Sequence, residues 1–405
     1  MRWRGFELPV IRSMTPIDLV AVSTASSPLA SPEFRHGWQR LRSTFAPAVA
    51  WLEVAQPGRQ ALLSEVVHSP VARALPDSAR VLLLAHGHVL LTRGVLAHLA
   101  SALDSTAAAT AVHAFDSGYP PPQEPDYCTL QGMERFLERL DHASPAAAPD
   151  EGSQHALVTL TTLGAVRKGL VLDRAFWIPT AYVHDFSNYH QGRREEVLPL
   201  VPEDTRRLLD VGGGEGGFLI AAKEALVCET HLAEYSADAC RLASQHVDHV
   251  WQGDFFTQTF MTSAQQQAAV FDCITFLDVL EHTSDPQLWL ERARTLLAPG
   301  GVVVASIPNV GHWGVIADLL EGRWDYCPVG IHCVTHLRFF TEHSVQELFT
   351  QCGYEIDRIE FVKVPCPTHW AEHWTRTPGL QTLPGSWDTY AFLVRARPTV
   401  NKGAQ

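Results

Sequence analysis

One glycine-rich stretch constrains the fold of this 405-residue chain more than any other segment. The apolar pair Leu208-Leu209 is followed by Asp210, and a dense run of glycines over residues 212–217 then leads to Phe218, where a helical pattern begins. This order predicts a buried strand, a tight turn and a helix N-terminus. Glycine suits such a turn because it adopts positive φ and lets a ligand lie against the backbone.

Strand-like and helical segments alternate regularly after this loop. The strand-like runs are 206–211, 227–234, 248–253, 271–278, 300–307, 354–364 and 389–397. Ser236 and Asp285-Pro286 are suited to begin two of the intervening helices. Seven strands, the first five joined by helical crossovers, predict an α/β fold with a doubly wound, seven-stranded Rossmann-like sheet.

The N-terminal half predicts a second, smaller α/β domain. Its strand-like runs are 19–24, 48–54, 79–85, 156–162 and 175–184, with helical stretches near 32–44 and 92–103. A polar, Pro/Ala-rich loop is expected at 141–155. Because 405 residues exceed one average domain, we expect a domain at 1–180, a second at 181–398 and a disordered tail at 399–405.

Four acids stand at the ends of four consecutive predicted strands: Asp210, Glu234, Asp254 and Asp278. The carboxyl ends of such strands meet at one edge of the sheet, where ligands bind. The glycine spacing is Gly-x-Gly-x-Gly and not Gly-x-Gly-x-x-Gly, and the preceding acid suits a cationic or zwitterionic ligand better than a diphosphate. Glu234 can accept both hydroxyls of a ribose, and Asp254 can accept from an exocyclic amine. A nicotinamide or flavin site is the alternative.

These motifs resemble those of the class I S-adenosylmethionine-dependent methyltransferases over residues 186–398. The resemblance rests on Leu-Asp-Val-Gly-Gly-Gly-Glu-Gly, Gly-Asp-Phe, Leu-Asp-Val-Leu-Glu-His and Leu-Ala-Pro-Gly-Gly, in that family's order. It implies S-adenosylmethionine as the cofactor. In addition to Asp210, it implies ten residues that contact this cofactor: Gly212, Gly214, Gly216, Glu234, Tyr235, Asp254, Phe255, Asp278, Tyr189 and Arg193. Phe255 or Phe256 would lie against the purine, while Tyr189 and Arg193 would close over the methionine end. Gly213 departs from the family, in which many relatives carry Cys or another small residue.

Methyl transfer to a hydroxyl requires an aligned nucleophile and a group that removes its proton. Histidine is best suited to that task near neutral pH. We expect His282, His312 or His336 to act as the base, with hydrogen-bonded pocket histidines as the alternative. The expected acceptor contacts are Asn309, Trp313, Trp324, Tyr326 and Arg338. Trp324 and Tyr326 could instead form a small core of their own.

The N-terminal half weakly resembles a family 2-type glycosyltransferase domain. The resemblance lies in a strand, a short turn, Leu91-Thr92-Arg93-Gly94 and a helix, but His86-Gly87-His88 occupies the turn in which that family carries an Asp-x-Asp motif. It implies a degenerate or substrate-docking domain. The first expected acceptor is therefore a hydroxyl of a sugar or glycan precursor. The alternatives are a quinone-like or natural-product ring, methylated at oxygen or carbon, and a bifunctional glycosyltransferase or carbohydrate-binding protein.

Composition narrows the partners. A net charge of −13 argues against nucleic acid and anionic membranes, and no apolar run is long enough for a membrane helix. Eight scattered cysteines favour a reducing compartment and a cytoplasmic protein. No metal is expected, because the spacing of Cys327, His332, Cys333 and His336 matches no standard zinc site. A homodimer is left open.

Overall fold

The computed structural model describes most of the chain, which divides into two compact units. The described residues are 17–24, 32–45, 47–106, 109–116, 127–143, 148–149, 156–187, 189–255, 270–368, 371–372 and 385–399. Unit 1 comprises residues 1–125 and 133–186, and unit 2 comprises residues 126–132 and 187–405. The short segment Asp126–Gly132 thus belongs to the C-terminal unit although it lies within the N-terminal half of the sequence.

A seven-stranded sheet forms the centre of unit 2, with the strand order β12-β11-β10-β13-β14-β16-β15. The first five strands in this order run parallel, and β16 pairs antiparallel with both β14 and β15. Their bounds are β10 Arg207–Val211, β11 Glu229–Glu234, β12 His249–Gln252, β13 Phe271–Leu277, β14 Leu297–Pro308, β15 Tyr354–Lys363 and β16 Thr389–Pro398. The central strands are apolar on both faces, as parallel strands between helices must be.

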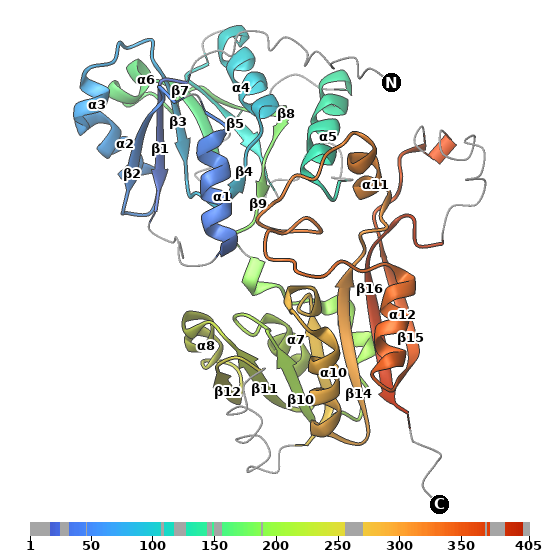
Figure 1. The fold of residues 1–405 in the computed structure, drawn as a ribbon. Coiled ribbons are helices and arrows are strands. Elements are labelled where there is room, and N and C mark those ends of the chain that lie inside the picture. The colour runs from blue at the N-terminus through green and yellow to red at the C-terminus, as the bar shows by residue number, and fades with distance from the viewer. Residues whose placement is uncertain are drawn as a thin grey trace, which may run out of the picture. The chain divides into compact units, whose positions relative to one another are not determined.

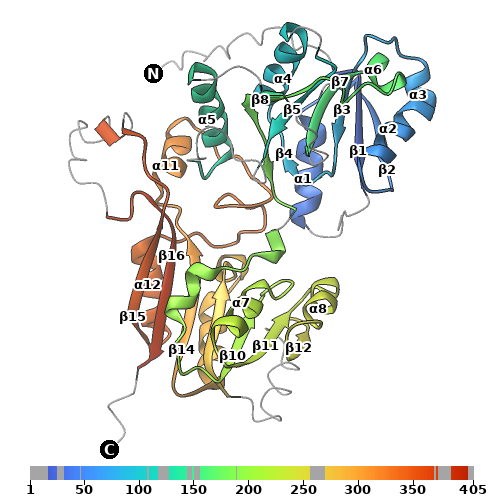
Figure 2. The same cartoon turned by 180° about the vertical axis from the view of Figure 1, so that it is seen from behind.

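Helices cover both faces of this sheet. One face packs on α10 (Pro286–Leu296) and α12 (Glu342–Gln351), which lie in front of β14 and β15 in Figure 1. The other face packs on the 3₁₀ segment η2 (Glu195–Leu200), α7 (Gly217–Ala225) and α8 (Ala237–Ala243), as Figure 2 shows from behind. The doubly wound connectivity of this sheet stays a prediction.

Three shorter elements complete unit 2: η1 (Tyr189–Gln191), η3 (Leu280–His282) and α11 (Trp313–Leu320). The predicted helix starts are confirmed. The Ser236 side chain accepts a hydrogen bond from Ala239 N–H (3.3 Å), and Asp285 accepts from Leu288 N–H (3.1 Å) with Pro286 in the first turn. Both caps satisfy N–H groups that a helix start leaves without partners.

Unit 1 is built on its own seven-stranded sheet, in the order β2-β1-β3-β7-β5-β8-β6. Strand β7 runs antiparallel between β3 and β5, whereas β2, β1 and β3 are mutually parallel. The bounds are β1 Leu19–Ser23, β2 Ala50–Val54, β3 Arg80–Leu84, β5 Ala111–Phe115, β6 Ala148–Pro149, β7 Val158–Thr162 and β8 Ala175–Tyr182. A two-stranded sheet pairs β4 (Val89–Leu90) with β9 (His184–Asp185).

Several elements of the N-terminal half were not predicted from the sequence pattern. The bounds are α1 Pro32–Ser43, α2 Arg59–His68, α3 Pro70–Arg73, α4 Arg93–Ser105, α5 Leu130–Ala143 and α6 Leu163–Arg167. Helices α1 and α4 agree with the predicted ones, but α2, α3, α5, α6 and the strands β4, β5 and β6 were not predicted. The loop expected at 141–155 contains the end of α5 and strand β6 in its described part. Most of the predicted tail lies outside the described residues, as does Phe256.

Two further observations concern the cysteines and the apolarity of the helices. All eight cysteines lie in the described part of the chain, and all are free thiols. Across the described residues, no helix combines the length and apolarity needed to span a membrane.

Tyr354 tests how strongly α10 is fastened to the sheet. Its ring is buried, and its hydroxyl donates a 2.9 Å hydrogen bond to the Leu290 carbonyl of α10. We expect Tyr354→Phe to lower the free energy of unfolding by about 1 kcal/mol, which is the usual worth of one hydrogen bond. Tyr354→Ala removes the ring as well and should cost about 3–5 kcal/mol. Urea unfolding followed by circular dichroism measures both, and equal losses in the two variants would contradict this assignment.

Candidate functional site

The glycine loop connects β10 to α7 at the carboxyl edge of the unit 2 sheet. Gly212, Gly214 and Gly216 all have positive φ, between 56° and 82°, which L side chains rarely adopt. Gly216 is the N-cap of α7, so the first N–H groups of that helix have no side-chain cap. A loop of this kind presents backbone donors to a ligand.

Asp210 is buried beneath the glycine loop, next to Gly213. Its side chain is buried and accepts a hydrogen bond from the Thr275 hydroxyl (2.6 Å), while Oδ2 has no partner. Burial raises the pKa of Asp210 to about 7. A Cβ on Gly213 would overlap Oδ2 of Asp210 and lie 2.9 Å from Cδ1 of Leu232. Gly213, the departure from the family pattern, is therefore required by the position of Asp210.

Glu234 joins the end of β11 to the glycine loop. One carboxylate oxygen accepts from Gly214 N–H (3.0 Å) and the other from Ser236 N–H (2.7 Å). Each oxygen keeps a second lone pair for a further donor. The carboxylate is thus fixed in orientation and can still accept a pair of hydroxyls, which fits the ribose contact that the family resemblance implies.

Arg194, and not Arg193, reaches the carboxyl ends of β13 and β14. The Arg194 guanidinium pairs with the Asp278 carboxylate and donates to Ser306 Oγ (2.9 Å), and Ser306 Oγ donates to Asp278 Oδ1 (2.6 Å). Among the described residues other than glycine, Arg194 (φ 48°) and Asp278 (φ 56°) alone have positive φ. Such backbone costs about 1–2 kcal/mol per residue, so the ion pair joins two strained positions.

Arg193 lies on the surface. Its guanidinium pairs with Glu195 and Glu224, and the Arg193 side chain is 42% exposed. This placement does not fit the predicted contact with the methionine end of a cofactor. Arg194, and not its neighbour Arg193, points inward, because Arg194 has a left-handed backbone. No sequence pattern indicated this backbone conformation.

Tyr189 stands beside the same acids. Its backbone segment packs on the start of α7, since a Cβ on Gly217 would lie 2.6 Å from the carbonyl oxygens of Gln191 and Gly192. Tyr189 is 37% exposed, so only part of it is desolvated. That desolvation, and then the charges of Cys333, Asp278 and Glu281, raise the pKa of Tyr189 well above its usual range. Tyr390 of β16 has the same kind of surroundings, because burial and the charge of Asp278 also raise its pKa.

Three predicted cofactor contacts lie in different surroundings. Phe255 is buried in the core against Phe276 and Trp289, at ring distances of 6.0 and 5.4 Å, which does not fit contact with a purine. Tyr235 is 80% exposed just beyond Glu234. Asp254 follows β12 and is partly exposed at the same edge of the sheet as Glu234.

Glu281 forms the core of a buried polar group with two of the predicted histidines. The Glu281 side chain is fully buried, and neither carboxylate oxygen has a hydrogen-bond partner. His336 Nε2 lies 3.9 Å from Glu281 Oε1, and the His282 ring lies 4.7 Å from the His336 ring. Burial, followed by the charge of Asp278, raises the pKa of Glu281 well above its usual range. Glu281 is the Glu of the Leu-Asp-Val-Leu-Glu-His motif, directly before His282, and it was not among the predicted site residues.

The tautomer of His336 follows from its partners. Its Nδ1 lies 2.9 Å from the Ile331 carbonyl, so Nδ1–H donates and Nε2 keeps its lone pair. Burial lowers the pKa of His336 to about 4, so the ring is neutral at pH 7. His282 is partly exposed, whereas His336 and Glu281 are buried. Candidate ligand atoms of all three lie within 4.8 Å of one another, so the group can also hold a metal ion.

His312 has a structural environment. It is the N-cap of α11, where Nδ1 accepts from Gly314 N–H (3.1 Å) and lies 2.9 Å from Cys128 Sγ. Its Nε2 lies 3.1 Å from the Val364 carbonyl, and burial lowers its pKa to about 4. Both ring nitrogens are thus occupied inside the protein, which does not fit the predicted role as a base.

Two predicted acceptor contacts are also occupied inside the fold. The Asn309 side chain donates to the carbonyls of Ser386 (3.1 Å) and Thr389 (2.8 Å) and accepts from Gly311 N–H (2.8 Å). Trp313 is buried against Trp387 and donates to the Val364 carbonyl (3.0 Å). These contacts fix the loop after β14, and the buried amide and indole are not available to a ligand.

The remaining predicted acceptor contacts lie in the segment after α11. Trp324 stacks on His332 at 4.2 Å and meets Phe339 edge-on at 5.2 Å, which agrees with a small local core. Tyr326 is 45% exposed. Arg338 donates to the Ser284 carbonyl, and its backbone N–H donates to the Glu281 carbonyl (3.0 Å). Arg338 therefore braces the loop that carries Glu281.

Unit 1 has polar groups of its own at the carboxyl end of β3. His86 Nε2 lies 3.8 Å from Asp185 Oδ1, and Asp116 is near enough to act on the pKa of His86. His88 is buried with Nε2 unpartnered, and burial lowers its pKa to about 4. The turn itself has no carboxylate, but β5 and β9 bring two carboxylates beside it.

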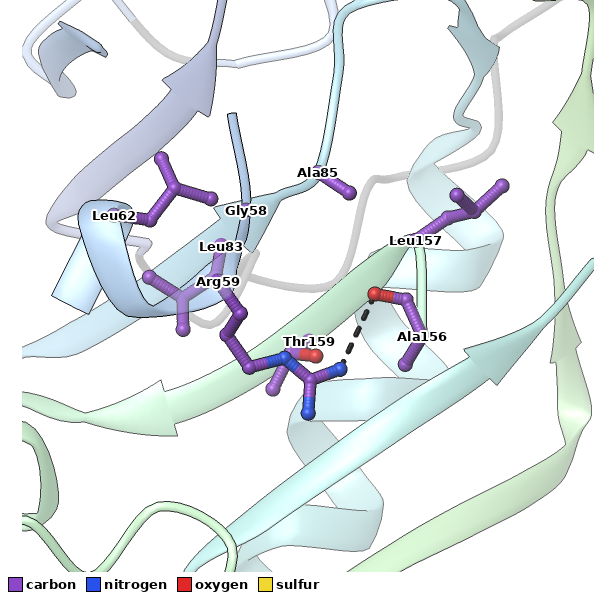
Figure 3. A pocket seen from close by; sticks show the side chains of 8 residues that line it. All are labelled: Gly58, Arg59, Leu62, Leu83, Ala85, Ala156, Leu157 and Thr159. Carbon is purple, nitrogen blue, oxygen red and sulfur yellow. Dashed lines mark hydrogen bonds between the residues drawn. The ribbon is translucent and has the colours of Figure 1, made fainter. Parts of the chain in front are cut away.

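A cavity of about 210 Å³ opens on the same side of the unit 1 sheet. Its lining, shown in Figure 3, is apolar apart from Thr159 and Arg59, whose guanidinium donates to the Ala156 carbonyl (3.3 Å). Gly58 and Arg59 begin helix α2, so the cavity lies at a helix N-terminus without a side-chain cap.

Comparison with known proteins identifies relatives of the C-terminal half. A family model described as a methyltransferase domain matches residues 182–359. A ubiquinone biosynthesis O-methyltransferase of Cereibacter sphaeroides (strain KD131) is 26% identical over 181 residues, which are 44% of this chain and 72% of that protein. A protein of the same name from Idiomarina loihiensis is 36% identical over 141 residues, which are 33% of this chain and 55% of that protein.

Solved structures of similar proteins include an S-adenosylmethionine-dependent methyltransferase from Archaeoglobus fulgidus. It covers 52% of this chain and 97% of its own, at 17% identity and a TM-score of 0.36.

Substitution of Gly213 tests the architecture of the loop. Because a Cβ there overlaps Asp210, we expect Gly213→Ala to displace the loop, to lower the melting temperature by several degrees and to weaken S-adenosylhomocysteine binding at least tenfold. Calorimetric titration and thermal unfolding measure the two effects. Gly385→Ala is the control, because its Cβ meets no atom within 4 Å. A Gly213→Ala variant that binds as tightly as the wild type would show that Asp210 moves without cost.

Proposed function

Because this protein is an S-adenosylmethionine-dependent methyltransferase, we propose that it methylates a hydroxyl oxygen of a small acceptor held beside His282, His336 and Glu281. The observation that carries the proposal is the buried Glu281 carboxyl without a hydrogen-bond partner, next to a histidine whose tautomer is fixed. Unsatisfied buried polar groups of this kind concentrate at functional sites.

The proposed cofactor contacts follow the loop geometry. The backbone of Gly212, Gly214 and Gly216 would contact the amino acid part, and the two oxygens of Glu234 would accept the ribose hydroxyls. Arg194 is better placed than Arg193 to act at the methionine end, because it lies beside Asp278 while Arg193 pairs with surface acids. Tyr189 and Asp278 would face the same region.

The proposed reaction is an in-line displacement. The acceptor oxygen forms a bond to the methyl carbon, the bond between that carbon and the sulfonium sulfur breaks, and S-adenosylhomocysteine leaves. The acceptor proton passes to a neutral histidine. His282 is the partly exposed member of the group and would meet the acceptor, whereas His336 and the Glu281 carboxyl would hold the His282 ring from behind.

The names of the relatives favour a phenolic hydroxyl of a quinone-like ring as the first acceptor class to test, because both relatives described above are O-methyltransferases of ubiquinone biosynthesis. A phenol ionises near pH 10 and so needs a weaker base than a sugar hydroxyl. The sugar or glycan hydroxyl is the second class, and it rests on the N-terminal half.

For the N-terminal half we propose a glycosyltransferase-like domain that has lost its usual metal motif. The support is the mixed sheet together with His86, His88, Asp116 and Asp185 at the end of β3. Thermal unfolding with nucleotide sugars, with and without Mn²⁺, tests this: a shift that Asp185→Asn abolishes supports retained binding. If none of these ligands shifts the transition, the domain has no nucleotide-sugar site.

We expect His282→Ala and His336→Ala each to lower kcat about 10²–10⁴-fold, the usual worth of general-base catalysis, while S-adenosylhomocysteine binding stays intact. Glu234→Ala should show the opposite pattern, with cofactor affinity lost first. Turnover on a panel of phenols and sugars, together with calorimetric binding, separates the two effects. His343→Ala is the control, since that side chain is 81% exposed on α12. Wild-type turnover in both site variants would remove this group from the mechanism.

Metal removal distinguishes two possible roles of His282, His336 and Glu281, which are proton transfer and metal binding. If His282, His336 and Glu281 move a proton, activity survives dialysis against EDTA. If they hold a metal, activity is lost and returns when one divalent ion is added back. The second result would replace the base assignment with metal-assisted activation of the acceptor hydroxyl.

A further inference from the structure

A second group of potential ligands lies at the opposite edge of the unit 2 sheet. Glu229 and His231 occupy alternate positions near the start of β11, so their side chains lie on one face. His249 begins β12 and is the register partner of His231. The group lies at the amino end of these strands, whereas the glycine loop and Glu234 lie at the carboxyl end.

The three side chains converge. Glu229 Oε1 lies 2.7 Å from His249 Nε2, and Glu229 Oε2 lies 3.4 Å from His231 Nε2. One potential ligand atom from each residue lies within 4.8 Å of the other two. A carboxylate oxygen and two imidazole nitrogens form the donor set typical of zinc sites that keep an open position for water.

The state of His231 is the independent evidence for a ligand. The residue is 2% exposed, and neither ring nitrogen makes a hydrogen bond; the nearest acceptor is Glu229 Oε2, 3.4 Å from Nε2. A buried imidazole whose Nδ1 has no partner and whose Nε2 has only this long contact costs free energy, because water would have satisfied both nitrogens. The ring is held in place by Trp251, stacked at 5.4 Å, and by Phe271, edge-on at 5.0 Å. His231 is therefore oriented by its neighbours without being satisfied by them.

We propose that Glu229, His231 and His249 bind one divalent transition-metal ion, with Zn²⁺ as the first candidate and water completing the coordination. Mixed nitrogen and oxygen donors select Zn²⁺ and similar ions over Mg²⁺ and Ca²⁺, which prefer oxygen alone. Arg207 supports the site from outside, because its Nε donates to Glu229 Oε2 at 3.1 Å and so orients the carboxylate.

Metal binding requires one local movement. The rings of His231 and His249 are stacked at 4.5 Å with an interplanar angle of 14°, whereas imidazole lone pairs lie in the ring plane. One ring must turn for both to face the same ion. The His249 side chain is 49% exposed at the start of the edge strand, so it can turn while His231 stays fixed.

The bound ion would fasten the edge strand β12 to β11. These strands are also joined at their carboxyl ends, where Gly253 N–H donates to the Glu234 carbonyl (2.9 Å). The backbones of the two strands also pair from His231–His249 to Glu234–Gln252, so a metal at the amino end would add a side-chain cross-link to this ladder and so support the strand that carries Glu234. The site is structural and separate from the proposed catalytic group around Glu281.

The test uses the full chain without a histidine tag, stripped of metal by chelation. Zn²⁺ is titrated by calorimetry and Co²⁺ by visible absorption, which reports tetrahedral nitrogen and oxygen ligation. We expect one equivalent of Zn²⁺ to be lost in His249→Ala and in Glu229→Gln but retained in His282→Ala. Zn²⁺ should raise the melting temperature of the wild type by several degrees and should not raise that of His249→Ala.

The matched control is His343→Ala, because His343 and Glu347 form an exposed pair on α12 at 3.4 Å and belong to no group of three potential ligands among the residues that the structure describes. Circular dichroism confirms that each variant is folded. Zn²⁺ stoichiometry in His249→Ala and Glu229→Gln equal to that of the wild type would overturn the proposal, as would a wild type that binds no Zn²⁺. Neither readout depends on methyl transfer, so this proposal and the proposed activity can fail separately.

Discussion

The placement of two carboxylates around one loop determines much of unit 2. Asp210 lies beneath the glycine loop, and its Oδ2 has no hydrogen-bond partner. Glu234 accepts hydrogen bonds from N–H groups of the loop and of the start of α8. The glycines follow from this arrangement, since Gly213 must leave room for Asp210 and Gly212 must leave room for Val279. A loop held in this way by its own sheet presents its backbone in one conformation before any ligand arrives, which lowers the ordering cost of binding.

Polar groups are distributed unevenly along the strands of this sheet. The middle of β10, β13 and β14 is apolar and buried, whereas Asp278, Glu281 and Ser306 lie at or beyond the carboxyl ends. Burial, and then repulsion from the negative charge of Asp278, raise the pKa of Glu281 well above its usual range, so the protonated form of Glu281 is favoured. The fold therefore concentrates electrostatic cost at the edge where chemistry is proposed, and the apolar layers on both faces compensate for it.

The sequence predicted the strands of unit 2 well because their signal is local. The runs of β10, β11, β12 and β13 each end at, or directly before, an acid or a glycine, and the order of such runs determines where their ends meet. Side-chain direction carries no comparable signal. Arg193 and Arg194 are neighbours of the same type, and a left-handed backbone at Arg194 decides which one reaches Asp278. Asn309 and Trp313 have residue types that suit a binding site, but carbonyls of Ser386, Thr389 and Val364, supplied from more than 50 positions away, occupy them.

The segment Asp126–Gly132 has a consequence for how the chain can be divided. It belongs to the unit that carries the methyltransferase motifs, and it brings Cys128 Sγ to the histidine that begins α11. A protein that starts near residue 181 would contain every recognised motif and still lack this part of its own fold. Sequence continuity and structural independence therefore do not coincide here. A polypeptide that is to contain all of unit 2 must therefore include Asp126–Gly132 as well as residues 187–405.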